Sequence, residues 1–146
     1  METNNYPSWL VPLDIAKKLK KIEFDTPCTF LWDSSEDSDN LRCYLDEQEG
    51  VYLPNSFNYN SPDTSGYYVY ISIPTWEQAF EWFRKKDMFH SIHISEDLLH
   101  RVKFFEAEIR DKNANIICII SKLTYEEARK ALINKLIELY ETNINI

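Results

Sequence analysis

The sequence has little glycine and no long apolar run. Only two of the 146 residues are glycine, Gly50 and Gly66, so a glycine-lined loop that cradles phosphate is excluded. No apolar run exceeds five residues, whereas a membrane-spanning helix needs about 20. The chain does not open with a basic, apolar leader, which predicts no secretory signal and a cytoplasmic location.

Cysteine and histidine are also too sparse to predict a metal centre. Cys28, Cys43 and Cys118 are widely spaced, so they form no CxxC pair and are interpreted as reduced packing residues. His90 and His93 lie an odd number of residues apart, which on a strand directs them to opposite faces. With His100 added, no ligand set is complete. We therefore expect no metal, no cofactor and no catalytic residues.

Acidic residues dominate, and they are concentrated in one segment. The whole chain carries a net charge of −8. Between Asp25 and Gly66 there are nine acidic residues and one basic residue, Arg42, so this segment alone accounts for the imbalance. Such a surface opposes binding to a nucleic-acid backbone. It is typical either of a solvated loop or of an acidic face that docks on a basic protein.

Three groups of residues are candidates for binding. The acidic segment offers carboxylates, the strand near residue 70 offers tyrosines that can anchor an interface or pack across strands, and one compact cationic group could hold an anion. The partner-binding candidates are Glu36, Asp37, Asp39, Tyr67, Tyr68 and Tyr70, and the anion-binding candidates are Arg84, Lys85, Lys86 and Arg101.

Periodicity and capping residues predict one α+β domain over residues 1–146, with three principal helices on a largely antiparallel sheet. Capping boxes at Thr75 and Thr124 open two of the helices. The expected helices are 12–22, 75–84 and 125–141; the expected strands are 29–32, 41–46, 51–53, 67–73, 89–94, 102–110 and 116–120. The spacing over 95–110 also fits a helix, and a strand is chosen for 102–110 because the β-branched run after it needs a neighbour to pair with. Residues 33–66 form an acidic, loop-rich insert, with exposed loops over 33–40 and 54–66, and residues 95–97 cap one helical turn.

Three sequence blocks resemble a family of small uncharacterised proteins from bacteriophages and mobile elements of Bacteroidota. The blocks are Tyr6-Pro-Ser-Trp-Leu-Val-Pro12 leading into Ile15–Ile22, Ile73-Pro-Thr-Trp-Glu-Gln-Ala-Phe-Glu-Trp-Phe-Arg84, and Thr124–Tyr140. The family has no assigned activity, so the resemblance transfers no functional residue. It implies an accessory protein acting in a bacterial host cell, since small proteins of such elements often bind and block a host component.

These observations lead to one function and two alternatives. The main hypothesis is a non-enzymatic binding protein, including a counter-defence factor, that docks on a host protein with a basic surface or sequesters a small signalling ligand. The alternatives are a structural or virion-associated accessory domain and a small enzyme that uses histidine or carboxylates. No membrane partner is expected, and the oligomeric state is left open.

Overall fold

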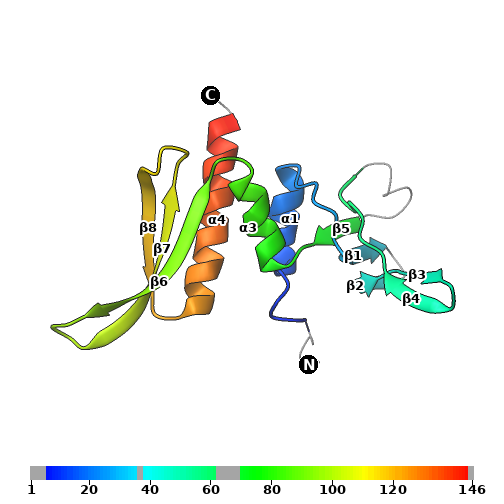
Figure 1. The fold of residues 1–146 in the computed structure, drawn as a ribbon, viewed down its shortest axis with the longest axis horizontal. Helices are drawn as coiled ribbons and strands as arrows, with labels where there is room; N and C mark the ends of the chain where they lie inside the picture. The colour runs from blue at the N-terminus through cyan, green and yellow to red at the C-terminus, as the bar shows by residue number, and fades with distance from the viewer. Residues whose placement is uncertain (1–5, 36–37, 62–69, 145–146) are drawn as a thin grey trace. The chain divides into compact units, whose positions relative to one another are not determined.

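The fold is α+β, as predicted, and its contacts divide the chain into two compact units. The computed structural model describes residues 6–35, 38–61 and 70–144 (Figure 1). Unit 1 is Met1–Ala79 and unit 2 is Phe80–Ile146. The described residues form three helices and three antiparallel sheets rather than one sheet. No described helix is long and apolar enough to cross a bilayer.

Unit 1 combines helix α1 (Leu13–Lys21) with a three-stranded sheet in the order β2-β1-β5. Pro12 starts the helix with a fixed φ of −58°. Three lysines in the last turn stabilise the helix, because their positive charges lie at the negative end of its dipole. The apolar stripe of α1 packs against β5 (Tyr70–Ile73). The buried residues of this unit include Leu10, Val11, Ile15, Leu19, Phe24, Leu31, Ile73 and Trp76.

The loop predicted over residues 33–40 is wrong for its described residues, because 33–35 and 38–40 belong to two paired strands. Strands β1 (Phe30–Ser35) and β2 (Ser38–Cys43) pair in antiparallel register, with Asp33 opposite Asn40. Polar composition suggested a loop, but cross-strand partners satisfy these side chains. The Asp33 carboxylate is buried and lies 3.2 Å from Arg42 Nε.

A second hairpin follows, and its turn was predicted correctly. Strands β3 (Leu45–Gln48) and β4 (Val51–Pro54) form a two-stranded sheet of their own. The turn residues Glu49 and Gly50 have φ values of 51° and 79°, the left-handed pair that a tight hairpin requires. The predicted single strand 41–46 is instead interrupted at Tyr44, which separates β2 from β3.

Helix α3 (Trp76–Arg84) contains the boundary between the two units. Its predicted capping box is confirmed, since the Gln78 amide donates to Thr75 Oγ1 and the Thr75 amide donates to Gln78 Oε1. Trp76, Phe80 and Phe83 are buried, as the helical spacing predicted.

Unit 2 consists of the end of α3, a sheet in the order β6-β7-β8, and helix α4 (Tyr125–Ile144). The strands are β6 (Phe89–Asp97), β7 (Val102–Arg110) and β8 (Ile116–Lys122). The β7–β8 hairpin was predicted. The helical turn predicted at 95–97 is wrong, because β7 pairs with β6 along the whole of β6.

Helix α4 covers one face of this sheet and leaves the other face open. Along β7, Ala107 and Ile109 are fully buried, while Glu106 and Glu108, which alternate with them, point to the opposite face. Figure 1 shows α4 running beside β6–β8. The helix contributes Ala128, Leu132, Ile133, Leu136 and Ile137 to the core.

Candidate functional site

The β3–β4 hairpin is the most exposed acidic element that the structure describes. All eight of its strand residues are exposed, on both faces. Its carboxylates are Asp46, Glu47 and Glu49, and its exposed apolar side chains are Leu45, Val51, Tyr52 and Leu53. No lysine or arginine occurs anywhere between Arg42 and Arg84 in the sequence. The hairpin therefore presents negative charge mixed with apolar surface.

Strand register distributes these groups over both faces of the hairpin. Glu47 lies opposite Tyr52, and Asp46 lies opposite Leu53. Residues directly opposite one another point to the same face. Each face therefore pairs a carboxylate with a large apolar side chain, so neither face is suited to burial within unit 1. Protein interfaces combine such apolar anchors with polar surroundings.

The acidic candidates predicted from the sequence are only partly described. Glu36 and Asp37 lie outside the described residues. Asp39 accepts a hydrogen bond of 2.7 Å from Trp32 Nε1, so this side chain is engaged by its own sheet. Sequence reasoning overlooked Asp46, Glu47 and Glu49 as a group. The signal was a run of polar and acidic residues, 46–49, directly before Gly50 and an apolar run, 51–53, directly after it, so that neither strand has the alternation of a half-buried strand.

Of the tyrosine candidates, Tyr70 is described, and Tyr67 and Tyr68 lie outside the described residues. The Tyr70 hydroxyl is 3.3 Å from that of Tyr44, and the ring of the buried Tyr59 contacts both rings. Tyr44 directly precedes β3, and its carbonyl accepts a hydrogen bond from the Asn55 amide just after β4. The tyrosine cluster (Tyr44, Tyr59 and Tyr70) thus forms the base of the acidic hairpin.

Burial in this region shifts two pKa values. Desolvation raises the pKa of the Tyr59 hydroxyl, with nearby acidic groups acting in the same direction. It also raises the pKa of the Cys28 thiol to about 12, while a hydrogen bond with Ser72 opposes the shift. Cys28 is fully buried, so it fits a packing role and not that of a nucleophile.

The predicted cationic group is not brought together. Arg84 is engaged by Glu81 at 2.5 Å, and Lys86 Nζ lies 5.1 Å from the centre of the Trp82 ring. These residues precede β6, whereas Arg101 follows it in the β6–β7 turn. A nine-residue strand is roughly 30 Å long, so Arg101 cannot share an anion with the other three.

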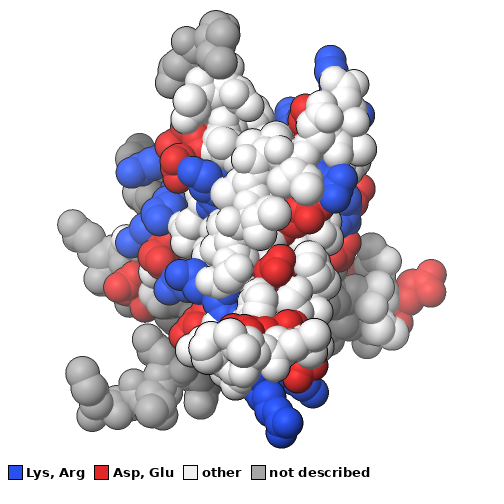
Figure 2. Space-filling view, turned by 90° about the vertical axis from the view of Figure 1, so that its left-hand side faces the viewer, with Lys and Arg blue, Asp and Glu red and all other residues white. Residues whose placement is uncertain are grey.

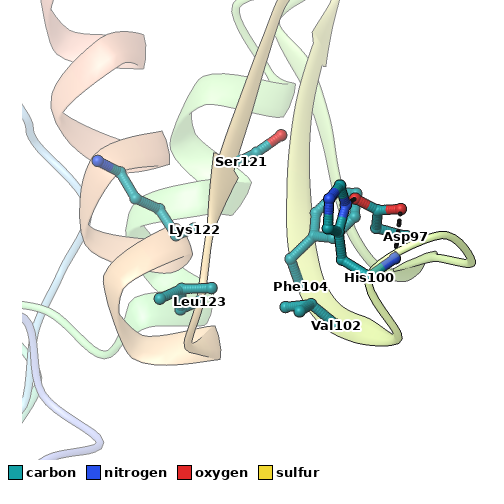
Figure 3. Close-up of a pocket in the computed structure, with 7 residues that line it drawn as sticks. All are labelled: Asp97, His100, Val102, Phe104, Ser121, Lys122 and Leu123. Carbon is teal, nitrogen blue, oxygen red and sulfur yellow. Dashed lines mark hydrogen bonds and ion pairs between the residues drawn. The ribbon is translucent and has the colours of Figure 1, made fainter.

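A second feature is a pocket of about 460 Å³ in unit 2, beyond the end of β8. It is lined by Asp97, His100, Val102, Phe104, Ser121, Lys122 and Leu123. It forms because β8 pairs with β7 only from Phe105 onward, which leaves the edge of β7 open next to Val102 and Phe104. In Figure 3, Ser121 and Leu123 lie on one side of the pocket, across from Val102, Phe104 and the Asp97–His100 pair. The Lys122 side chain points away from the other lining residues.

The polar pair in this pocket stabilises the β6–β7 turn. Asp97 accepts hydrogen bonds from the Leu99 and His100 amides, and its other oxygen lies 2.7 Å from His100 Nδ1. The hydrogen bond from His100 is the main reason that the pKa of Asp97 is lowered. Such local bonds are typical of Asx turns. Both side chains are exposed, so this pair resembles a turn cap more than a catalytic dyad.

The remaining histidines are separated, as predicted. His90 stacks on Phe80, with ring centres 4.3 Å apart. His93 lies on the other face of the sheet, where its Nε2 is 3.7 Å from Glu106 Oε2. Over the described ranges, no group of three histidine, cysteine or acidic side chains could hold a metal ion.

Comparison of the chain with protein-family models, with curated proteins and with solved structures finds no match.

Proposed function

We propose that the chain is a non-enzymatic binding protein that docks on a basic surface of another protein through the β3–β4 hairpin. The observation that carries this proposal is the composition of the hairpin, in which three carboxylates and four large apolar side chains are exposed together. The resemblance to proteins of phages and mobile elements suggests that the partner belongs to the bacterial host.

The charge on the hairpin favours a basic partner because, within the part of the chain that the structure describes, no lysine or arginine forms an ion pair with its three carboxylates. Asp33, by contrast, faces Arg42 and is neutralised within its own sheet. Exposed carboxylates attract a positively charged protein surface and accelerate the encounter of the two proteins. This effect weakens as salt is added. The three hairpin carboxylates therefore contribute mainly to the association rate.

The apolar side chains of the hairpin contribute a different part of the binding energy. Tyr52 is 64% exposed, the largest exposed fraction among the aromatic residues of the described chain. Tyrosine anchors are enriched among residues that dominate binding energy, and losing one mainly increases the dissociation rate. The proposal thus assigns steering to the carboxylates and anchoring to Tyr52.

Two variants test this division of roles. The first replaces the carboxylates together, Asp46→Asn, Glu47→Gln and Glu49→Gln, and the second is Tyr52→Ala. Wild-type and variant chains are immobilised, proteins from a bacterial host lysate are captured at low and high salt, and binding kinetics are measured with each captured protein. The charge variant should slow association several-fold at low salt, and Tyr52→Ala should accelerate dissociation at least tenfold.

A matched control removes the same amount of charge from exposed positions of α4: Glu126→Gln, Glu138→Gln and Glu141→Gln. This control should bind at the wild-type rate. The proposal is wrong if the control and the hairpin variant slow association equally, or if all chains retain the same proteins at every salt concentration.

A further inference from the structure

Strand β8 is an edge strand that lacks proline and an inward-pointing charge, two of the features that usually protect edges. Among the described residues it pairs with β7 only, so its outer row of backbone amides and carbonyls faces away from the sheet. Five of its seven residues are consecutive apolar residues, Ile116–Ile120, and its one charge is Lys122 at the end. A bulge can also protect an edge, but the one register shift between β7 and β8 is confined to the start of β8, at Ile116 and Ile117, and leaves Cys118–Lys122 in regular pairing.

The opposite edge of the same sheet is different. Strand β6 carries His90, Ser91, His93, Ser95, Glu96 and Asp97 among its nine residues. Polar and charged residues of this kind discourage pairing with another chain. The two edges therefore differ in their capacity to pair, and β8 is the one open to another strand.

Both faces of β8 are apolar, which favours a strand as its occupant. Ile119 lies opposite Glu108, points to the open face of the sheet and is 51% exposed; Ile117, at the register shift, is 47% exposed. Cys118 and Ile120 lie on the face covered by α4, opposite Ile109 and Ala107 of β7. Figure 2, which faces the side on which β6–β8 lie in Figure 1, shows a broad band of uncharged residues with charges mainly along its margins.

We propose that β8 pairs antiparallel with β8 of a second copy of this chain, which joins the two sheets into one of six strands. In an antiparallel pair, residues opposite each other point to the same face. In a symmetric pair of identical strands, one residue therefore lies directly opposite the same residue of the second copy, and the two-fold axis passes between these two. A pair centred on Ile119 uses all seven residues of β8 and places the irregular Ile116 and Ile117 at the ends of the ladder. Ile119 then lies opposite Ile119 of the second copy, and Ile117 lies opposite Ser121.

This register is compatible with the charges and with α4. The two Lys122 side chains lie six residues apart along the ladder, roughly 20 Å, so they do not repel each other. Helix α4 packs mainly on β7 and β8. Because α4 lies over β7 and β8, its axis is about one strand spacing, ~4.8 Å, from the two-fold axis of the dimer. The two copies of α4 then lie on the same face with axes about 10 Å apart, which is a usual distance between packed helices.

The two-fold position of Ile119 gives a specific test. Wild-type protein at tens of micromolar should sediment with twice the 17.4 kDa mass of one chain. Ile119→Lys places two like charges directly opposite each other in the dimer and should weaken dimerisation at least tenfold. The matched control is Ile94→Lys on β6, where Ile94 is 65% exposed; it should dimerise like wild type.

Mixing variants then separates β8 pairing from unspecific association. Ile119→Lys and Ile119→Glu should each be monomeric alone, and an equimolar mixture should form a heterodimer because opposite charges then face each other. Circular dichroism of each variant checks that the fold is retained. The proposal is overturned if wild-type protein is monomeric, if Ile94→Lys disrupts the dimer as strongly as Ile119→Lys, or if mixing does not restore it.

Discussion

Leu132 tests whether the apolar face of α4 is placed correctly. Its side chain is fully buried beside the sheet of unit 2. Leu132→Ala removes three buried carbon groups, which at about 0.8 kcal/mol each amounts to about 2.4 kcal/mol of lost burial. The cavity left behind adds to this, so the free energy of unfolding should fall by roughly 2–5 kcal/mol.

Urea titration followed by far-ultraviolet circular dichroism measures this loss. Lys130→Ala is the matched control, because Lys130 is exposed on the same helix and its truncation should change the free energy of unfolding by less than about 0.5 kcal/mol. A loss below about 0.5 kcal/mol for Leu132→Ala as well would refute the reasoning, since the helix would then present a different face to the sheet.

Two further predictions concern unit 1. Cys28 should react with a thiol reagent at pH 8 far more slowly than Cys43 and Cys118, because burial and a pKa raised to about 12 keep its thiol protonated; equal rates for all three thiols would contradict this. Thr75→Ala should lower the free energy of unfolding by about 1 kcal/mol, because the Gln78 amide loses its capping acceptor, whereas Thr75→Ser should restore most of it in the same urea assay.

Helices could be predicted from the sequence because their determinants are local. At Thr75 the capping residue and its partner Gln78 are three positions apart, so one short segment contains the whole signal. At Thr124 the hydroxyl likewise accepts from the Glu127 amide. The apolar stripe of each helix then follows from its 3.6-residue period, which is why the buried face of α4 was anticipated.

The β1–β2 hairpin was missed because its determinants are not local. A run of acidic and polar residues favours a loop when each residue is considered alone. In the structure, Asp33 acquires Arg42 and Asp39 acquires Trp32 only after the two strands have paired. The same pairing decides which carboxylates stay available, and for this reason the sequence pointed to Asp39 and overlooked Asp46.

The two proposals assign different tasks to the two units, and the distribution of charge supports this division. Residues 1–79 contain thirteen acidic and five basic residues, whereas residues 80–146 contain eleven of each. Self-association through the strongly acidic unit 1 would be opposed by repulsion, but β8 belongs to the electrically balanced unit 2. A dimer formed there carries two acidic hairpins, so a partner with two suitably spaced basic sites would bind the second site intramolecularly and gain avidity. Ile119→Lys should then weaken binding to such a partner while leaving the affinity of a single hairpin for a single site unchanged.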